Sequence, residues 1–446
     1  MKRLLSSTLA LLLLLGVVVS TLACSSSDAD EPSTNTEDTP DQGENTDDPA
    51  STPSDEPTEQ PETPTEPAEP VINDENISMM VEPLTDHVDD DAYDRATAYN
   101  GRANLTLLQS VMNRAKAGED ITVAAIGGSI TAGSASSNKE KTSYLAIFRD
   151  WWTDTFPDID VTLVNAGIGA TTSYLGVHRV QKDVIDKGAD VCVIEFSVND
   201  YADSYYKQTY ESLIARLLDN DVAVILLFMV KQDGTSKQND NVTSGIKMAV
   251  PMVSYGDAVM PLIEAGELAW TDVSPDNIHP NDFGHAIAGE LLHEFLNMVF
   301  VYTPNEVTVV PTRKELLTQT KYFNSYLLDS QSLESDVIEG FAPTTQAYST
   351  YQNGWHTVNG GVIEFTATFS RMGAMYRKTV DGKSGKCQVF VDGKLAATLD
   401  GDYTGGWGDY DRTDQFFSSR KTEEHTVRLV VEDGMAFTLV RLLVAE

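Results

Sequence analysis

Short apolar runs alternate with longer amphipathic segments between residues 120 and 300, and this alternation constrains the fold most strongly. The runs ITVAAI, VTLVN, DVCVIEFS and VAVILLFMV are typical of strands buried on both faces. Helical segments such as SYLAIFRDWWTDTF separate them, and a last helix is expected in DFGHAIAGELLHEFLNMVF, with Asn281 or Asp282 as its N-cap. Such alternation predicts a parallel sheet covered by helices on both faces.

The pattern changes near residue 304. Residues 363–369 alternate between apolar and polar side chains, as in a half-buried strand. An Asp-Gly pair at 392–393 separates two apolar runs, which indicates a hairpin, and two more strands flank a second Asp-Gly pair at 433–434. We therefore predict an α/β domain over residues 76–303, followed by a smaller all-β sandwich domain over 304–446.

The N-terminal part has the composition of an export signal and a tether. Residues 1–23 read as a secretory signal peptide, and Leu22-Ala23-Cys24 resembles a bacterial lipobox. We expect Cys24 to carry a lipid that anchors an exported protein on the outer side of the cell membrane; ordinary secretion with a chance cysteine is the alternative. Residues 24–75 are rich in Ser, Thr, Pro, Asp and Glu and predict an extended, disordered linker.

Charge and cysteine content exclude several classes of function. The formal net charge of -37 argues against nucleic acid and anionic membrane surfaces as partners. Beyond Cys24 the chain has only Cys192 and Cys387, so neither a disulfide framework nor a Cys-rich zinc site can form.

Ser129 follows two glycines at the end of the first apolar run. By itself this is weak evidence, because a tight turn explains it equally well, and Thr131 rules out the G-x-S-x-G elbow. Three further polar segments, VNAGIGATTS, VIEFSVND and SPDNIHPNDFGH, follow later strands or precede the last helix. Because ligands bind outside the carboxyl ends of parallel strands, we expect all four segments to meet at one rim.

These segments hold the groups that acyl transfer requires. A serine hydroxyl needs a base, and the base needs a group that fixes its tautomer. His279 can serve as the base for Ser129, and Asp276, three residues earlier, can orient it. An oxyanion needs donors, and three are available: the backbone N–H of Ser129, a backbone N–H in the Gly169–Ala170 turn, and the side-chain amide of Asn199.

The motifs GGSIT, NAGIGATTS, SVND and DNIH, in this order, resemble the four blocks of the SGNH (GDSL-type) hydrolases over roughly residues 120–299. The resemblance implies a flavodoxin-like three-layer α/β/α fold with a parallel sheet, and ester hydrolysis through an acyl-enzyme without metal or organic cofactor. It implies Ser129 as nucleophile, Asn199 as oxyanion donor, His279 as base and Asp276 as its partner.

The chain departs from the family pattern at two positions. Ala170 stands where the family often has its oxyanion glycine, which leaves open which N–H points inward. Ser197 is the first residue of the SVND motif, where the family more often has glycine, and this serine could narrow or polarise the site.

Two more histidines could belong to the site. His285 follows His279 after a His-x5-His spacing, with Asp282 between them; this could indicate a metal, but the spacing at a helix start does not put both rings on one face. His178 could touch substrate, and a helix-surface position is the favoured interpretation.

The leading hypothesis for function is an extracellular carbohydrate esterase that removes acetyl or similar groups from a polysaccharide. The loop GDYTGGWGDYD holds Tyr403, Trp407 and Tyr410, which could stack on sugar rings, although packing against the sandwich is the favoured reading of the loop. A lipase or thioesterase is one alternative, against which the polar stretch KQDGTSKQNDNVTSG argues. A surface lipoprotein that binds glycan without cleaving it is the other.

Overall fold

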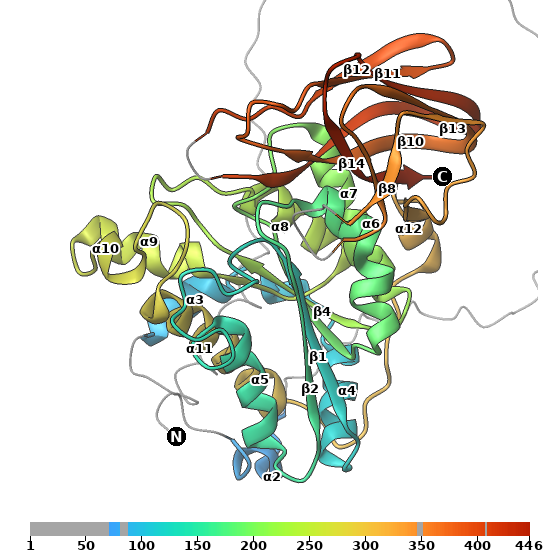
Figure 1. Cartoon of the computed structure of the whole chain (residues 1–446). Helices are drawn as coiled ribbons and strands as arrows, with labels where there is room; N and C mark the ends of the chain where they lie inside the picture. The colour runs from blue at the N-terminus through green and yellow to red at the C-terminus, as the bar shows by residue number, and fades with distance from the viewer. Residues whose placement is uncertain (1–70, 81–87, 346–350, 406–407) are drawn as a thin grey trace, which may run out of the picture.

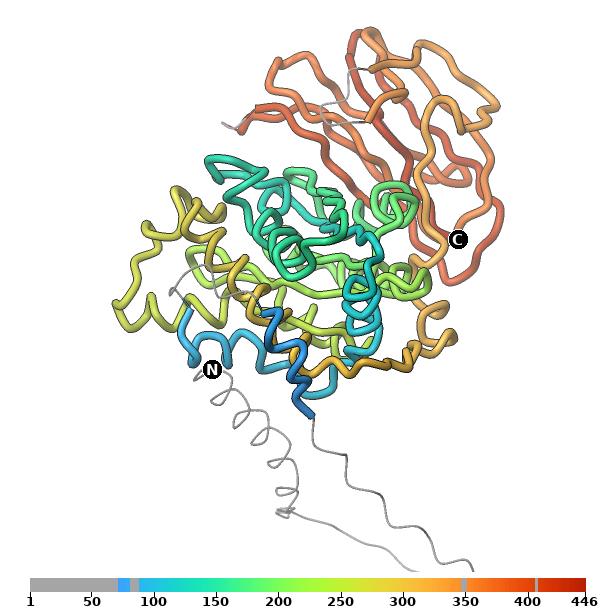
Figure 2. Tube along the Cα trace, turned by 90° about the horizontal axis from the view of Figure 1, so that it is seen from below, coloured from blue at the N-terminus to red at the C-terminus, as the bar shows by residue number. Residues whose placement is uncertain are grey.

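The computed structural model describes residues 71–80, 88–345, 351–405 and 408–446. An α/β part and an all-β part lie side by side within these ranges, as the blue-to-yellow and orange-to-red segments of Figure 2 show. The expected signal peptide, Cys24, nearly all of the expected linker, and Trp407 lie outside the described residues.

The α/β part is built on a five-stranded parallel sheet with strand order β2-β1-β3-β4-β5. The strands are β1 (Ile121–Gly127), β2 (Val161–Gly167), β3 (Val191–Glu195), β4 (Ala223–Phe228) and β5 (Met252–Ser254). The four predicted strands are confirmed, and the order is that of flavodoxin-like folds. β5 was not predicted, because three residues are too few for an apolar run to stand out.

Helices cover both faces of this sheet (Figure 1). Val123 and Ala125 of β1 pack toward one helical layer, and Ala124 and Ile126 pack toward the other. The first layer contains α3 (Asp90–Thr97), α4 (Thr106–Lys116), α5 (Tyr144–Thr155), α9 (Tyr255–Ala265) and α11 (Asp282–Val301). The second contains α6 (Ser173–Asp183), α7 (Ser204–Leu218) and α8 (Gln238–Met248). The predicted three-layer arrangement is thus confirmed.

Short helices complete this part of the chain: α2 (Asp74–Ile77), η1 (Asn100–Arg102), η2 (Ile185–Lys187), α10 (Trp270–Val273) and α12 (Lys314–Thr318). The N-cap of α11 is Asn281, whose side chain accepts a hydrogen bond from the backbone N–H of Gly284 at 3.0 Å. This distinguishes between the two candidates for the cap.

The all-β part is an antiparallel sheet in which hydrogen bonds link all nine strands. They are β6 (Ser325–Leu328), β7 (Val337–Glu339), β8 (Ala342–Thr344), β9 (Gly354–Thr357), β10 (Gly361–Lys378), β11 (Lys386–Val391), β12 (Lys394–Asp400), β13 (Tyr410–Val431) and β14 (Phe437–Ala445). Irregularities at 369–371 and 372–373 interrupt the long β10–β13 pair, and such bulges bend a sheet. Side chains from β9, β11 and β12 therefore reach one core.

The two Asp-Gly pairs of the all-β part play different roles. The pair at 392–393 joins the antiparallel neighbours β11 and β12, so the predicted hairpin is confirmed. The pair at 433–434 joins β13 to β14, which both pair with β10 rather than with each other. A turn signal therefore marks where a strand ends, but not which strand becomes its partner.

The two parts share a hydrophobic core along α6. Met375, Val440 and Leu443 of the all-β part belong to the same buried cluster as Tyr174. A Cβ added at Gly373 would lie 2.1 Å from the Tyr174 hydroxyl oxygen, so β10 approaches α6 as closely as a glycine allows.

This interface corrects the prediction for His178. The side chain is 3% exposed, and its Nδ1 lies 2.6 Å from the carbonyl oxygen of Tyr174. The rings of Tyr174 and Tyr322 pack edge-on against it. The expected helix-surface position was wrong because the segment leading into the all-β part covers this side of α6, which no local pattern reveals.

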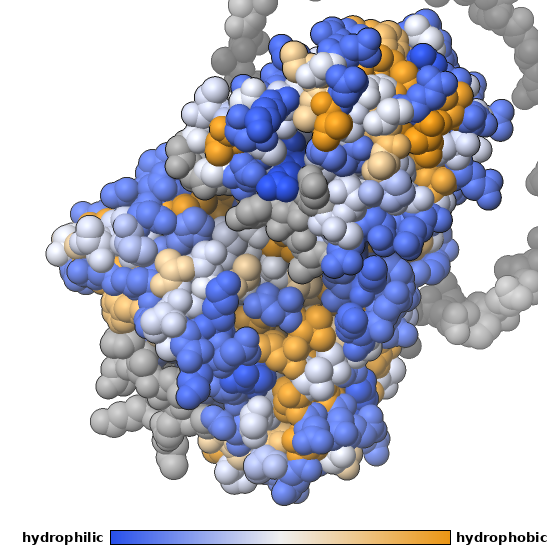
Figure 3. All heavy atoms as spheres, viewed as in Figure 1, coloured by the Kyte–Doolittle hydropathy of each residue, from blue (hydrophilic) through white to orange (hydrophobic). Residues whose placement is uncertain are grey.

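The face of the molecule drawn in Figure 3 is hydrophilic over most of its area. Hydrophobic side chains gather over the all-β part and beside the edge of the parallel sheet, where Val161 and Leu163 of the edge strand β2 are only half-buried. Among the described residues, no helix has both the length and the apolar character needed to cross a membrane.

Candidate active site

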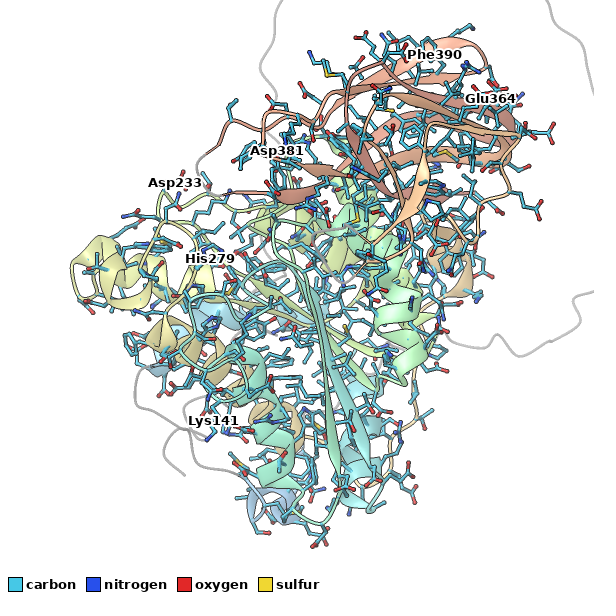
Figure 4. The ribbon with its side chains drawn as sticks, viewed as in Figure 1. Lys141, Asp233, His279, Glu364, Asp381 and Phe390 are labelled. Carbon is cyan, nitrogen blue, oxygen red and sulfur yellow. The ribbon has the colours of Figure 1, made fainter. Side chains whose placement is uncertain are left out.

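Ser129, His279 and Asp276 form a continuous hydrogen-bonded chain. Ser129 follows β1, whereas the other two lie in the loop between α10 and α11. Ser129 Oγ lies 2.8 Å from His279 Nε2, although the two residues are 150 positions apart. His279 Nδ1 lies 2.8 Å from Asp276 Oδ2. Figure 4 shows His279 at the end of the sheet that lies toward the all-β part. This geometry allows the imidazole to take a proton from the serine.

The loop that carries Asp276 is held by its own hydrogen bonds. Oδ1 of Asp276 accepts the backbone N–H groups of Ile278 at 2.8 Å and His279 at 2.7 Å. Its carbonyl oxygen accepts the Trp270 indole N–H at 2.6 Å and the Ser274 hydroxyl at 2.8 Å. Partial burial opposes ionisation, but the hydrogen bonds from His279 and Ile278 outweigh it and lower the pKa of Asp276. The carboxylate is therefore charged and fixed when it orients the ring.

Two glycines let the chain turn sharply before the serine. A Cβ at Gly127 would lie 2.1 Å from Thr131 Oγ1, and a Cβ at Gly128 would lie 2.5 Å from Asn199 Oδ1. Side chains at these positions would displace the turn or the asparagine. The backbone N–H of Ser134 donates to the Ser129 carbonyl at 2.9 Å, which closes the turn.

The three predicted oxyanion donors lie around Ser129. The Asn199 side chain packs against Gly128, and its Oδ1 is buried without a hydrogen-bond partner in the described chain. An added Cβ at Gly169 would be 3.8 Å from the Cβ of Ser129, so the loop with the Gly169–Ala170 turn, called the glycine loop below, borders the serine. Ala170 adopts a left-handed φ of 58°, which costs a non-glycine residue about 1–2 kcal/mol. Glycine would adopt the backbone of Ala170 without this strain.

Ser197 supports the scaffold, because its hydroxyl bonds to the backbone of Met229, the residue directly after β4. It donates to the carbonyl of Met229 at 2.9 Å and accepts the N–H of the same residue at 2.7 Å. The serine therefore ties the end of β3 to the end of β4. The expected polarising effect on the site has no support in these contacts.

Asp200 braces the glycine loop from behind. Its Oδ1 accepts the backbone N–H of Ser173, the first residue of α6, at 2.8 Å. Burial raises the pKa of Asp200 to about 7, against the hydrogen bonds from Ser173 and the positive charge of Lys237. The Asp200 carboxyl thereby fixes the start of α6, directly after the Gly169–Ala170 turn.

His285 also supports the turn and is fully occupied by protein groups. Burial lowers the pKa of His285 to about 4, so the ring is neutral. Its Nδ1 accepts the backbone N–H of Tyr144 at 3.3 Å, and its Nε2 donates to the carbonyl of Ser134 at 3.2 Å. Both nitrogens are used in this way, so the ring braces the segment that follows the nucleophile.

Sequence reasoning missed Glu195 and Tyr144, which lie beneath the turn. Both side chains are completely buried, and the Thr131 hydroxyl bonds to each of them. The only signal in the sequence was an acidic residue inside the apolar run VCVIEF.

Tyrosine side chains occur both in the all-β part and next to the SVND segment that carries Asn199. Tyr403 and Tyr410 pack edge to face with ring centroids 5.1 Å apart. Tyr201, two residues after Asn199, is 57% exposed and packs edge-on against Tyr206 at 5.6 Å. Burial raises the pKa of Tyr410, with smaller contributions from its neighbours, among them a further increase from Tyr201. Tyr201 is therefore one of the groups that influence the pKa of Tyr410.

Comparison with known proteins agrees with this geometry. Residues 125–287 match the model of the GDSL-like Lipase/Acylhydrolase family. A crystal structure of a two-domain esterase (CEX) active on acetylated mannans is 32% identical with a TM-score of 0.73. The same esterase co-crystallized with mannopentaose gives 31% identity and a TM-score of 0.72. Each comparison covers 79% of the present chain and 98% of the esterase chain.

A search of curated proteins found no match. The structural similarity extends over both parts of the chain, because 79% of its residues are aligned and the α/β part alone is shorter than that share. At this identity over nearly the whole of a two-domain esterase, the chain belongs to the GDSL-like lipase/acylhydrolase family and is a serine-dependent carboxylic ester hydrolase.

Proposed function

We propose that this enzyme is a carbohydrate esterase that removes acetyl groups from a polysaccharide, with an acetylated mannan as the first substrate to test. The observation that carries the proposal is the pair of 2.8 Å hydrogen bonds joining Ser129, His279 and Asp276. They occur in a chain that aligns with 98% of an esterase active on acetylated mannans. The hydrogen bonds supply the chemistry, and the similarity supplies the class of substrate.

The proposed reaction has two halves that share one base. Ser129 Oγ attacks the acetyl carbonyl carbon while His279 Nε2 takes its proton, and the oxyanion receives hydrogen bonds from the Asn199 amide and backbone N–H groups. His279 then gives the proton to the departing sugar oxygen, which leaves an acetyl-serine. In the second half, His279 takes a proton from water, the hydroxide oxygen attacks the acetyl carbon, and acetate leaves as Ser129 recovers its proton.

The aromatic side chains near Asn199 are the proposed contact for the polysaccharide. Tyr201 is exposed, and Tyr403 and Tyr410 of the all-β part are half-buried and mutually packed. Tyrosine rings present a flat apolar face with a polar edge, which suits sugar rings. A chain of sugars held there would extend past the nucleophile between the two parts of the protein.

Acetate release tests this function directly. The purified enzyme and Ser129→Ala are incubated with acetylated mannan, acetylated xylan, pectin and peptidoglycan. We expect release from mannan by the wild type only, with a loss of several orders of magnitude in the variant. Release from none of the polymers would refute the proposed substrate class.

p-Nitrophenyl esters from acetate to decanoate separate this function from the lipase or thioesterase alternative. A site shaped for acetyl groups should lose activity steeply beyond butyrate, whereas a lipase should gain activity with chain length. A rate that rises toward decanoate would favour the lipase.

We also propose that Cys24 is lipidated and that the mature enzyme is held at the cell membrane facing outward. The support is the signal-like segment, the lipobox-like sequence around Cys24 and the acidic, Pro-rich stretch that follows. Expression of the full chain and of Cys24→Ser, followed by membrane fractionation, tests this. The wild type should sediment with membranes and the variant should not; equal partitioning would refute the anchor.

A further inference from the structure

A buried carboxyl group lies directly beneath the nucleophile turn. Glu195 is the last residue of β3, paired in register with Gly127 of β1, and it is 0% exposed. Its Oε2 accepts the Thr131 hydroxyl at 3.3 Å, and its Oε1 has no hydrogen-bond partner among the described groups. The mechanism above does not use this carboxyl. Burial of a charged carboxylate without a counter-charge costs free energy of folding, so a carboxyl group at this position is unusual.

Thr131 connects Glu195 to the serine turn. Thr131 is completely buried, and its hydroxyl also lies 2.9 Å from the Tyr144 hydroxyl. Its carbonyl accepts the Asn165 side-chain amide at 3.0 Å. Thr131 is therefore fixed on three sides, from β2, from β3 and from α5, two residues after Ser129.

Glu195 is protonated at neutral pH. Burial raises the pKa of Glu195 to about 8, with hydrogen bonds from Thr131 and the Gly128 N–H opposing and the Asp200 charge adding to the rise. A neutral carboxyl both donates and accepts hydrogen bonds. The turn thus rests on a group that can satisfy polar atoms without bringing a charge beneath the nucleophile.

Within the described ranges, no Lys, Arg or His side chain pairs with Glu195. The titratable and charged groups around it are Tyr144 on α5, Cys192 on β3, Asp200 after β3, Arg179 on α6, Tyr210 on α7 and His285 on α11. Arg179 donates to the carbonyl of Gly127 at 3.3 Å and pairs with Asp183 at 2.9 Å. Ionised Glu195 would therefore be an uncompensated charge under the turn.

We propose that Glu195 is a positioning residue of the esterase: its carboxyl holds Thr131 and the Gly127–Gly128 backbone, and through them sets the place of Ser129 relative to His279 and Asn199. This inference rests on the proposed esterase function. Glu195 touches neither the substrate nor the reacting atoms. A displacement of the nucleophile of the order of 1 Å lowers the rate by about 100-fold, so this support controls turnover.

The test compares two replacements of the same carboxyl. Glu195→Gln keeps a neutral group that donates and accepts, and Glu195→Leu removes both abilities. Glu211→Gln is the matched control. Glu211 of α7 pairs with Lys247 of α8 at 2.6 Å, away from the turn that carries Ser129. The full chain is assayed with p-nitrophenyl acetate for kcat and KM, and its thermal unfolding is followed in parallel.

We expect Glu195→Leu to lower kcat by about 10- to 100-fold with KM within about 3-fold of wild type. Glu195→Gln should keep kcat within about 3-fold of wild type. It should also lack the loss of kcat that we expect of the wild type as Glu195 ionises above pH 8. Glu211→Gln should match the wild type throughout. A folded Glu195→Leu enzyme with wild-type kcat would overturn the proposal, as would an alkaline loss that persists in Glu195→Gln.

If Glu195→Leu does not fold, Thr131→Val tests the positioning role instead, because it removes only the hydroxyl that bonds to Glu195. Wild-type kcat in a folded Thr131→Val enzyme would refute the positioning role. The rate at which an organophosphonate inactivates Ser129 provides a second readout that needs no polysaccharide. Failure on every polymer together with normal cleavage of p-nitrophenyl acetate would refute the substrate class and leave the result for Glu195 intact.

Discussion

Replacing Asp276 by asparagine tests the arrangement of the catalytic groups most sharply. Asp276 uses both carboxylate oxygens: Oδ1 accepts two backbone N–H groups at 2.7 and 2.8 Å, and Oδ2 faces His279 Nδ1 at 2.8 Å. An asparagine has a single side-chain oxygen. If that oxygen keeps the two backbone bonds, the amide NH2 faces Nδ1, which must then be unprotonated.

The imidazole would in that case carry its proton on Nε2, the atom 2.8 Å from Ser129 Oγ, and could not accept the serine proton. A wrong tautomer of this kind costs about 10⁴ in kcat, or about 5.5 kcal/mol of transition-state stabilisation. The fold should survive, because the backbone hydrogen bonds of the loop remain. We therefore expect Asp276→Asn to lose turnover with little change in melting temperature.

The assay is kcat with p-nitrophenyl acetate, measured beside thermal unfolding. Asp272→Asn is the matched control, since Asp272 of helix α10 accepts the backbone N–H of the N-cap residue Ala269 at 3.0 Å and has no part in the proposed chemistry. It should retain wild-type kcat within about 2-fold. An Asp276→Asn enzyme with kcat within 10-fold of wild type would refute the tautomer argument.

Three further predictions follow from the contacts of the site. Gly128→Ala would place a Cβ 2.5 Å from Asn199 Oδ1, so we expect kcat to fall by about 100-fold, as for the loss of one oxyanion donor; an unchanged kcat at pH 7 would show that the amide does not act. Tyr410→Ala should raise KM for acetylated mannan while leaving p-nitrophenyl acetate kinetics unchanged, and equal effects on both substrates would exclude a glycan contact. The folded-state pKa of Asp200, about 7, exceeds its ordinary value of 3.8, so its contribution to stability is full below pH 3.8 and falls by about 1.4 kcal/mol per pH unit until pH 7. Urea unfolding between pH 4 and 7 should show a weaker pH dependence in Asp200→Asn, and parallel curves for the two proteins would contradict the buried, protonated state.

The elements that the sequence predicted are those whose signal is local. Four parallel strands, the last helix and the β11–β12 hairpin follow from apolar runs, caps and a turn pair. The rule that parallel strands present their carboxyl ends at one edge was sufficient to bring Ser129 and His279 together. These features depend on periodicity and chain direction, which a single sequence displays.

The features that the sequence did not reveal depend on contacts between distant segments. His178 is buried because the all-β part and the segment before it cover α6, although the helix itself looks amphipathic. Glu195 received no role because its partner, Thr131, lies in the turn that follows a different strand, β1. Ser197 was expected to affect the site, and its hydroxyl binds the Met229 backbone instead. In each case, tertiary packing decides where the side chain lies.

The close approach of β10 to α6 has a consequence for how the protein is built and inherited. With Gly373 against Tyr174 and a common set of buried apolar side chains, removing either part opens the shared cluster along α6, although each part also has a buried cluster of its own. Unfolding should then be one cooperative event, with a single calorimetric peak in place of two. Cutting the chain after α11 would expose apolar surface on α6 and favour aggregation, so a domain exchanged for the all-β part would have to supply the same apolar contact to α6.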